Sequence, residues 1–271
     1  MKTSSLNSTS RWFVALAATG LLVAGCSSAT SSSPTTTASS HGAHWEYSGS
    51  DGPSHWGSLG SSYATCADGS AQSPINLTNA VLADAPDPVI QYGDSAASVV
   101  NNGHTIQASP ARGGTISVSG TTYALSQIHF HAPSEHVVNG NSYPVEVHFV
   151  NTTADGKVAV LGVFLTPGGA DNPAWDSYIK TLATPKSLSE SATINFASLL
   201  PADRSTFRYG GSLTTPPCTE GVSWLVFTTA VQVSQQQIDA FVHAYDHNSR
   251  PVEPLDGRTI TIDHSTTKAA H

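Results

Sequence analysis

One short segment, Gln127-Ile-His-Phe-His131, alternates polar and apolar side chains with the period of two that a β-strand requires. On such a strand His129 and His131 point to the same face of a sheet. His148 lies on the next alternating run and would come opposite them if the two runs pair as antiparallel neighbours. Three neutral imidazoles leave one position of a tetrahedral zinc ion open for water, which is typical of a catalytic site. The segment therefore predicts a sheet protein with the metal site of a zinc hydrolase or hydratase.

Two polar residues are spaced to orient these imidazoles. Gln127 precedes His129 by two residues, and Glu146 precedes the third histidine by the same interval, so each lies on the face of its histidine. Each could accept the second ring N–H of that histidine and so hold a metal ligand in orientation. A lone His-x-His pattern is usually a pair of hydrogen-bonded or surface imidazoles. The metal hypothesis therefore depends on His148 and its neighbouring carboxylate.

Glu135 leaves a second interpretation open. The spacing His129-x-His131-x-x-x-Glu135 also fits the metal site of a cupin. In a cupin Glu135 would itself bind the metal, which could be iron or manganese, and the protein would be an oxygenase or an isomerase. Contact between Glu135 and the metal would distinguish the two interpretations.

The first 25 residues are typical of an export signal. Lys2 and Arg11 form its basic end, and residues 12–23 form an apolar run that is too short for a good membrane span. Cys26 follows small residues, as in a bacterial lipoprotein signal, which predicts that Cys26 becomes the lipidated first residue of the mature chain. The protein is then expected in the cell envelope, anchored by lipid outside the cytoplasmic membrane on the periplasmic or extracellular face.

The chain after the signal divides into a tether and one domain. Residues 26–43 are rich in Ser and Thr and are expected to be a solvated linker, and residues 44–271 are long enough for one large domain. The net charge of −8, without a basic run, argues against nucleic acid as a partner. Cys66 and Cys218 are expected to pair as a disulfide, because buried free thiols are uncommon in an oxidising compartment.

Short β-strands separated by Gly, Asn and Pro turns are expected from residue 99 to residue 227. Residues 158–165 and 222–227 are more continuously apolar, as in central strands that are covered on both faces. The chain is therefore expected to be mainly β, with a few peripheral short helices.

Two helices have clear start signals. Asn172 can cap a helix that begins at Pro173, and Ser234 with Gln237 forms a capping box before a second helix. The expected core-facing residues are Trp175, Tyr178, Ile179 and Leu182 in the first helix and Ile238, Phe241, Val242 and Tyr245 in the second. Both apolar stripes are explained by packing and imply no cofactor.

A series of short motifs runs along the chain from about His44 to Leu255. In order they are His44-Trp45-x-Tyr47, Gln72-Ser73-Pro74-Ile75-Asn76, Asn102-Gly103-His104, Gln127-x-His129-Phe130-His131, Ser134-Glu135-His136, Glu146-x-His148, Ala159-Val160-Leu161-Gly162, Leu213-Thr214-Thr215-Pro216-Pro217 and Arg250-Pro251. This series resembles the α-class carbonic anhydrases over nearly the whole domain. One departure is local, because Ala132-Pro133 leads directly to Ser134 where many animal members have a longer segment. That difference concerns the rim of the cleft and leaves the ligands unchanged.

The resemblance implies a fold, a cofactor and an activity. The fold is a large, mostly antiparallel twisted central sheet with a conical cleft that leads down to zinc. The cofactor is Zn²⁺ on His129, His131 and His148, and the activity is the reversible hydration of carbon dioxide to bicarbonate and a proton. The implied partners are this small-molecule substrate and, through Cys26, a membrane. A non-catalytic zinc-binding surface module on the same fold is the alternative from outside the enzymes.

The resemblance also assigns roles within the cleft. Thr214 would accept a hydrogen bond from the nucleophile and donate its own to Glu135, and its backbone N–H would hold the substrate oxygen. His104 would carry protons between the metal site and solvent through bridging waters. Tyr47 would help to organise the waters of the cleft. The substrate pocket would consist of Val150, Val160, Leu213, Thr214, Thr215, Val222 and Trp224.

Overall fold

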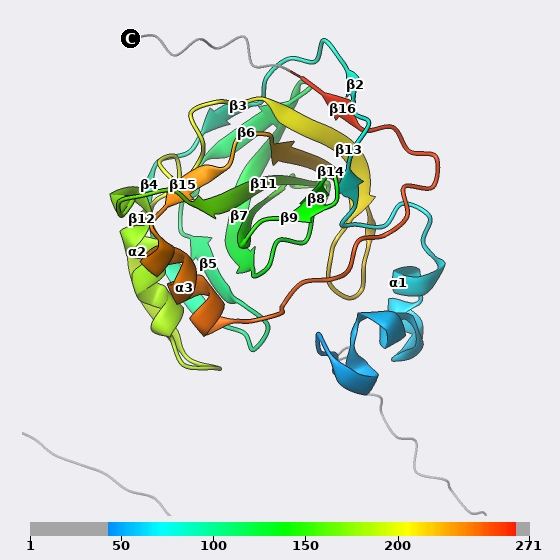
Figure 1. The fold of residues 1–271 in the computed structure, drawn as a ribbon, viewed down its shortest axis with the longest axis horizontal. Helices are drawn as coiled ribbons and strands as arrows, with labels where there is room; N and C mark the ends of the chain where they lie inside the picture. The colour runs from blue at the N-terminus through cyan, green and yellow to red at the C-terminus, as the bar shows by residue number, and fades with distance from the viewer. Residues whose placement is uncertain (1–42, 264–271) are drawn as a thin grey trace, which may run out of the picture. The chain divides into compact units, whose positions relative to one another are not determined.

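A sheet of thirteen strands organises residues 43–263, the part of the chain that the computed structural model describes (Figure 1). Its strands are β2 (Val81–Leu82), β3 (Val89–Gln91), β4 (Asp94–Asn101), β5 (Ile106–Pro110), β6 (Thr115–Val118), β7 (Thr121–His131), β10 (Val145–Thr152), β11 (Val158–Pro167), β12 (Ser189–Asn195), β13 (Thr206–Ser212), β14 (Glu220–Phe227), β15 (Val231–Val233) and β16 (Thr261–Ile262). A second, three-stranded sheet consists of β1 (Asn76–Leu77), β8 (Val137–Val138) and β9 (Asn141–Ser142). The predicted signal segment 1–25, Cys26 and the linker as far as residue 42 lie outside the described residues.

The fold is mainly β, and its large sheet is mostly antiparallel, as the resemblance implied. Along the main path the order is β12-β4-β5-β7-β10-β11-β14-β13-β16-β2. Most neighbours on this path are antiparallel, whereas β11 pairs in parallel with β14 and β15, and β16 pairs in parallel with β2. The sheet is therefore mixed, with the parallel β11–β14 pair near its centre.

The central strands bury side chains on both faces. On β11 the side chains from Ala159 to Leu165 are all buried, as predicted for a strand that is covered on both sides. Because side chains alternate between the faces, the buried apolar residues divide into separate clusters. The larger cluster includes Ile128, Phe130, Val147, Phe149 and Leu161. A smaller cluster, with Val160, Phe164 and Trp224, lies on the opposite face of the same strands.

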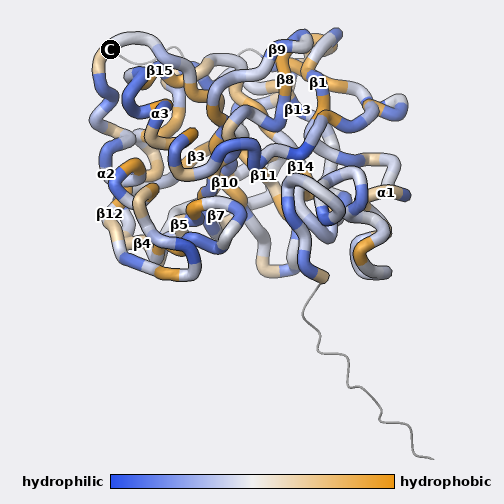
Figure 2. The backbone as a smooth tube through the Cα atoms, turned by 60° about the horizontal axis from the view of Figure 1, so that its bottom comes forward, coloured by the Kyte–Doolittle hydropathy of each residue, from blue (hydrophilic) through white to orange (hydrophobic). Residues whose placement is uncertain are grey.

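Helices cover the larger cluster. The helices α2 (Asp176–Ile179) and α3 (Gln235–Ala244) lie side by side (Figure 1), and α3 contacts β10 and β11. Hydrophobic and hydrophilic residues alternate along α3 (Figure 2), as expected of a helix with one face on a core. The segment before the sheet contains α1 (Thr65–Asp68) and the 3₁₀ turns η1 (Gly49–Asp51), η2 (Pro53–Ser58) and η3 (Ser61–Tyr63). Among residues 43–263, no helix is long and apolar enough to cross a membrane.

Both predicted helix starts are confirmed. The Asn172 side chain accepts a hydrogen bond from the backbone N–H of Ala174, and Pro173 occupies the first helical turn. The α-helical part of that helix is short, and the 3₁₀ turns η4 (Pro173–Trp175) and η5 (Lys180–Ala183) flank it. In α3, Ser234 Oγ accepts from the backbone N–H of Gln237 at 3.2 Å, and Gln237 Oε1 accepts from that of Ser234 at 3.1 Å.

One expected core-facing position of the second helix is wrong, and another contacts the core only in part. The Val242 side chain is 38% exposed, because it follows buried Phe241 by one residue and so points about 100° away around the helix. Tyr245 forms the C-cap of α3 with an extended backbone and is only partly buried. Its hydroxyl donates to Asn101 Oδ1 at the end of β4, so its polar tip has a structural role.

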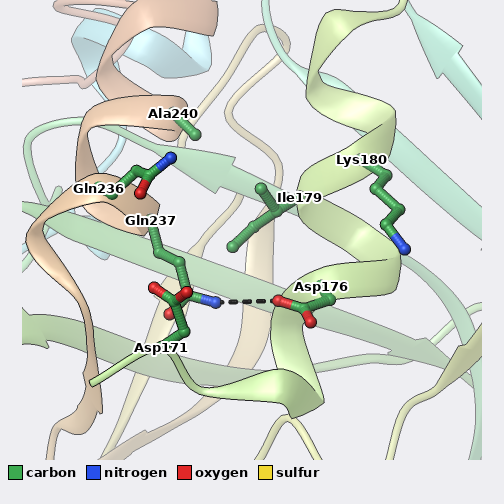
Figure 3. Close-up of a pocket in the computed structure, with 7 residues that line it drawn as sticks. All are labelled: Asp171, Asp176, Ile179, Lys180, Gln236, Gln237 and Ala240. Carbon is green, nitrogen blue, oxygen red and sulfur yellow. Dashed lines mark hydrogen bonds between the residues drawn. The ribbon is translucent and has the colours of Figure 1, made fainter.

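Gln237 also joins the starts of the two helices. Its Oε1 accepts from the backbone N–H of Asn172 at 2.9 Å, and its Nε2 donates to Asp176 Oδ1 at 3.2 Å (Figure 3). A hollow of about 330 Å³ lies between α2 and α3, lined in part by Asp171, Asp176 and Lys180. None of the predicted site residues lines this hollow.

The capping box gives a test of this packing. Ser234→Ala should lower the free energy of unfolding by about 1 kcal/mol, because the backbone N–H of Gln237 loses its acceptor at a buried helix start. Urea unfolding monitored by circular dichroism would measure the change. Gln235→Ala, at an exposed position in the same turn, is the control and should change stability by less than about 0.5 kcal/mol. Equal effects of the two substitutions would contradict the role of the cap.

Candidate active site

The three predicted metal ligands meet on one face of the sheet. In the antiparallel pair of β7 and β10, His148 lies directly opposite His129, and His131 lies two residues further along β7. The imidazole centroids are 5.0 Å apart for His129 and His131, 5.2 Å for His129 and His148, and 4.7 Å for His131 and His148. Each ring offers one nitrogen, and these three nitrogens lie within 4.8 Å of one another.

Each imidazole is held in orientation by an oxygen at its other nitrogen. Gln127 Oε1 accepts from His129 Nδ1 at 2.8 Å, and Glu146 Oε1 accepts from His148 Nε2 at 2.9 Å, as the spacing of these residues predicted. His131 Nδ1 donates to the backbone carbonyl of Asn248 at 2.7 Å. Because these oxygens only accept, the ring protons lie on those three nitrogens, and the lone pairs of the other three face one another.

The donor set fits a zinc ion. Burial, together with the charges of His131 and His148, holds the pKa of His129 well below its usual value. Burial likewise lowers the pKa of His131, despite the nearby Glu135 carboxylate. His131 Nε2 is buried without a hydrogen-bond partner among the described residues, which is costly for a polar atom unless it binds something. Three neutral imidazole nitrogens around one point are the ligand set of a catalytic zinc site.

Glu146 is the centre of a buried hydrogen-bond network. Its Oε2 accepts from the backbone N–H groups of Glu135 at 3.0 Å and His136 at 2.8 Å, and its Oε1 accepts from His136 Nδ1 at 2.7 Å as well as from His148. Burial by itself would raise the pKa of Glu146, but His136 and His148 outweigh burial and hold that pKa well below its usual value. The ionised carboxylate therefore fixes the Ser-Glu-His turn and one metal ligand together.

Glu135 lies beside the triad but is not part of it. Its Oε1 accepts from the backbone N–H of Arg250 at 2.9 Å, and its buried Oε2 is 3.4 Å from His131 Nε2. Oε2 has no hydrogen-bond partner among the described residues, so the hydrogen bond predicted from Thr214 is not seen. The reason is the orientation of the carboxylate. The backbone N–H of Arg250 holds Oε1, and the free Oε2 therefore faces the imidazoles.

The loop that carries Thr214 is fixed by a disulfide and by backbone hydrogen bonds. The predicted disulfide between Cys66 and Cys218 is present and joins α1 to this loop. The backbone N–H of Cys218 donates to the carbonyl of Thr215 at 2.8 Å, and that of Leu213 donates to the carbonyl of Thr219 at 2.9 Å. The Thr214 side chain is buried within this closed turn.

The apolar residues that were predicted to bind substrate gather beside the histidines. Val150 lies opposite Val160 in the register of β10 and β11, and Val160 lies opposite Trp224 on β14. These residues belong to the smaller cluster, together with Val222 and Leu213. The Trp224 ring packs edge-on against His148, with their centroids 4.9 Å apart. The sheet register therefore places an apolar surface next to the metal-binding imidazoles.

A pocket of about 110 Å³ lies beside the triad, next to the N-terminal segment of the domain. Its lining consists of Trp45, Tyr47, Asn102, His104, Thr105, Gln107, Gln127, His129, His131 and Thr215. His104 is stacked on Trp45 with ring centroids 3.7 Å apart, and its Nε2 is 3.0 Å from the Trp45 carbonyl oxygen. Burial, with a smaller contribution from the charge of Glu135, raises the pKa of Tyr47 well above its usual value, so its hydroxyl stays protonated. His104, Tyr47 and Thr215 thus share one pocket with two of the ligands.

Some of the contacts that shape the site could not be predicted. Asn248 binds His131 through a backbone carbonyl, which has no side-chain signature and lies 117 positions away in the sequence. The chain of contacts beyond Glu146 was also missed: His136 Nε2 is 2.6 Å from the Tyr209 hydroxyl, which donates to Ser73 Oγ at 2.8 Å. The motifs around Ser73 and His136 marked these residues as unusual, but only the fold shows that they touch.

Comparison with known proteins agrees with this geometry. The family model for the eukaryotic-type carbonic anhydrases matches residues 51–264. A carbonic anhydrase of Neisseria gonorrhoeae is 39% identical over 227 residues, which cover 82% of this chain and 90% of that protein. A carbonic anhydrase of Klebsiella pneumoniae is 41% identical over 224 residues, with 80% and 90% covered.

Solved structures agree as well. The α-carbonic anhydrase from Thermovibrio ammonificans, in complex with the inhibitor sulfanilamide, superposes with a TM-score of 0.78 at 44% identity and covers 82% of this chain and all of that one. The α-carbonic anhydrase of Photobacterium profundum gives a TM-score of 0.76 at 38% identity, with 80% of this chain and 100% of that chain covered. The chain belongs to the α-carbonic anhydrase family, and zinc is the metal of that family. The cupin interpretation is therefore not supported.

The two side chains that orient ligands should differ in what they stabilise. Gln127→Ala should weaken zinc binding by roughly 10–100-fold with little change in the unfolding of the metal-free protein. Glu146→Ala should weaken zinc binding too and should also lower the free energy of unfolding by about 3–5 kcal/mol, because buried donors lose their acceptor. Competition with a chelator would measure affinity, and urea unfolding would measure stability.

Glu220→Ala is the matched control for this comparison. Glu220 also accepts a backbone N–H, from Ala71 at 2.7 Å, but it lies nearer the surface than Glu146. Glu220→Ala should lower the free energy of unfolding by less than Glu146→Ala does, and it should leave zinc affinity unchanged. Similar unfolding free energies for Gln127→Ala and Glu146→Ala would show that the Glu146 network is not what holds this part of the fold.

Proposed function

We infer that this chain is a zinc-dependent carbonic anhydrase that interconverts carbon dioxide and bicarbonate. The observation that carries the inference is the triad of His129, His131 and His148 beside an apolar surface and below a polar pocket. When bound, zinc would act as a Lewis acid that lowers the pKa of a coordinated water, a property for which carbonic anhydrase is the standard example. The residues around the triad then have to bind an apolar substrate, orient the reacting groups and remove a proton.

The apolar surface suits the substrate. Carbon dioxide has no hydrogen-bond donor and no net charge, so a surface of Val150, Val160 and Trp224 can hold it without the loss of hydration that a polar group would suffer. Val222 and Leu213 complete the surface in this proposal, and Thr215 lies on its polar side, in the pocket. The product bicarbonate is charged and prefers water, so the same surface favours its release.

Glu135 and Thr214 are proposed to orient the reacting groups. An ionised carboxylate only accepts hydrogen bonds, so Glu135 would fix the direction in which the Thr214 hydroxyl donates. In this structure the free Oε2 of Glu135 faces the imidazoles, so this role requires the carboxylate and the Thr214 hydroxyl to turn toward each other. The backbone N–H of Thr214 would stabilise the charge that develops on the substrate oxygen.

His104 is proposed to carry the proton to solvent. It lines the same pocket as His129 and His131, and no hydrogen bond joins it to them, so the transfer would pass through waters in the pocket. Imidazole changes its charge near neutral pH, which makes it suited to both accepting and releasing a proton. Tyr47, in the same pocket, would donate to these waters through its protonated hydroxyl.

The fold by itself does not decide between an enzyme and a binding module. A dioscorin solved in complex with ascorbate shares the fold, with a TM-score of 0.75 at 30% identity over 83% of this chain. The complete set of three imidazoles, Glu135 and Thr214 supports catalysis, because a module that only bound zinc would have no use for the apolar surface beside the metal.

We also propose that the protein is exported and anchored by lipid at Cys26. The basic and apolar signal and the small residues before Cys26 support this, as does the Cys66–Cys218 disulfide, which suits an oxidising compartment. The Ser- and Thr-rich residues up to 43 would then connect the lipid to the catalytic domain outside the cytoplasmic membrane.

Activity should depend on the triad. His148→Ala should lose stoichiometric zinc and reduce stopped-flow hydration of carbon dioxide to the uncatalysed rate, because two imidazoles hold the metal far more weakly than three. Glu135→Gln is the matched variant and should keep zinc while losing most of the rate. Loss of zinc from Glu135→Gln as complete as from His148→Ala would make Glu135 a ligand and would sink the assignment of its role.

The proton shuttle has a separate signature. His104→Ala should slow turnover in weak buffer by at least about tenfold, within the range of general acid–base catalysis, and leave zinc affinity unchanged. Added imidazole should restore the rate, because it carries the proton in place of the missing side chain. Turnover equal to that of the wild type at low buffer concentration would remove His104 from the mechanism and leave the metal site untouched.

The anchor can be tested in cells. Wild-type protein should partition with membranes, whereas Cys26→Ser should be found in the soluble envelope fraction or remain unprocessed, with an active domain in either case. Attachment by more than one acyl chain is expected to be stable, so the difference should be large. Equal membrane partition of the two proteins would contradict lipidation.

A further inference from the structure

One buried side chain joins the turn that carries His104 to the strand that carries two metal-binding histidines. Asn248 is 2% exposed, and its Nδ2 donates to the backbone carbonyls of His104 and Phe130, both at 3.0 Å. Its Oδ1 accepts from the backbone N–H of Ala132 at 2.8 Å. All the hydrogen-bonding groups of this amide are therefore engaged, and each connects to backbone near the site.

The backbone of the same residue holds a metal ligand. The Asn248 carbonyl accepts from His131 Nδ1 at 2.7 Å. The neighbouring residues are tied to the same segment, because the N–H of His247 donates to the Ala132 carbonyl at 2.8 Å and the N–H of Arg250 donates to Glu135 Oε1 at 2.9 Å. Asn248 is thus fixed relative to His131 on both sides and can transmit that position to the His104 turn.

The His104 turn is also held by Trp45, on which the His104 ring stacks, by Asn101 at the end of β4 and by its own residues. Asn102 Oδ1 accepts from the backbone N–H groups of His104 and Thr105, both at 2.9 Å, and Gly103 has a φ of +93°. Thr105 Oγ1 donates to the Phe130 carbonyl at 2.8 Å, which is the other side-chain link to β7. The Asn248 amide binds both the Phe130 and the His104 carbonyl, so it sets how far the turn stands from the ligand strand.

We propose that Asn248 is a positioning residue, whose side-chain amide fixes the separation between His104 and the metal-binding imidazoles. The proposal rests on the proposed shuttle function of His104. Proton transfer through bridging waters requires that donor, waters and acceptor keep a narrow range of separations, so a small displacement of the turn has a large effect on rate. The His104 ring carries the proton, and the Asn248 amide holds the His104 turn at a fixed distance from the metal-binding imidazoles.

Two substitutions separate this role from simple packing. Asn248→Asp keeps the shape of the side chain and the acceptor for Ala132 but loses both donors, and Asn248→Ala loses the whole amide. Each variant, as the zinc-loaded full chain, would be assayed for zinc content, kcat and kcat/KM of carbon dioxide hydration in weak buffer and with added imidazole. In weak buffer kcat includes the proton transfer that regenerates the enzyme, whereas kcat/KM reports the steps up to hydration.

The expected result is specific to proton transfer. In both variants kcat in weak buffer should fall by about tenfold and kcat/KM by less, zinc content should stay stoichiometric, and imidazole should restore kcat. In a His104→Ala background the same substitutions should change kcat in weak buffer by less than about twofold, because the side chain that they displace is absent. Asn151→Ala is the control for loss of a buried amide, since Asn151 is fully buried and bonded to Tyr92 and Phe149. It should lower stability without an imidazole-dependent defect in kcat.

Three outcomes would overturn the proposal. Equal losses in kcat and kcat/KM without rescue by imidazole would show a structural role only. An undiminished effect in the His104→Ala background would show that Asn248 does not act through His104. A His104→Ala enzyme as fast as the wild type in weak buffer would instead refute the shuttle itself, and this proposal with it, so the two failures are told apart by the single variant.

Discussion

A buried negative charge sets the conditions for the rest of this site. The Glu146 carboxylate has no exposure to water, and such a charge is tolerated only when hydrogen-bond donors surround it. Its donors come from three places: the backbone of the Ser-Glu-His turn, the His136 ring and the His148 ring. The adjacent strand makes room for it with a glycine, because a Cβ at Gly162 would lie 3.0 Å from Oε1. One carboxylate thereby couples a metal ligand, a turn and a neighbouring strand.

The two faces of the central sheet have different roles: one packs the larger apolar cluster, and the other carries the metal-binding residues. One face of β7, β10 and β11 packs Phe130, Val147 and Leu161 into the larger cluster beneath α2 and α3. The other face of the same strands presents the imidazoles and the smaller apolar cluster. The strand backbones are rigid because the far face is densely packed, which helps to hold the separations of the imidazoles. This division also explains why α2 and α3 carry none of the predicted site residues.

The segment after α3 completes the site from a distance in sequence. Asn248 and Arg250 bind the backbone or side chains of His131, Ala132 and Glu135. The Arg250 guanidinium, which is 2% exposed, donates to the carbonyls of Ser73 and Cys66 and to the Gln72 side chain. The N-terminal segment, the disulfide and the turn that carries Glu135 therefore meet at one arginine. Removal of such a buried charge is generally more damaging than loss of an exposed ion pair.

The sequence by itself determined the strand that presents His129 and His131, the side chains that orient two of the ligands, and both helix starts, because these depend on local spacing of two to four residues. The motif series also identified the family and its metal. Only the tertiary structure decided that an Asn248 carbonyl orients His131, that Glu135 turns a free oxygen toward the imidazoles, and that Val242 faces solvent. Backbone carbonyls leave no trace in a sequence pattern, and the direction of a carboxylate or the exposure of one helix position depends on residues that meet it from distant parts of the chain.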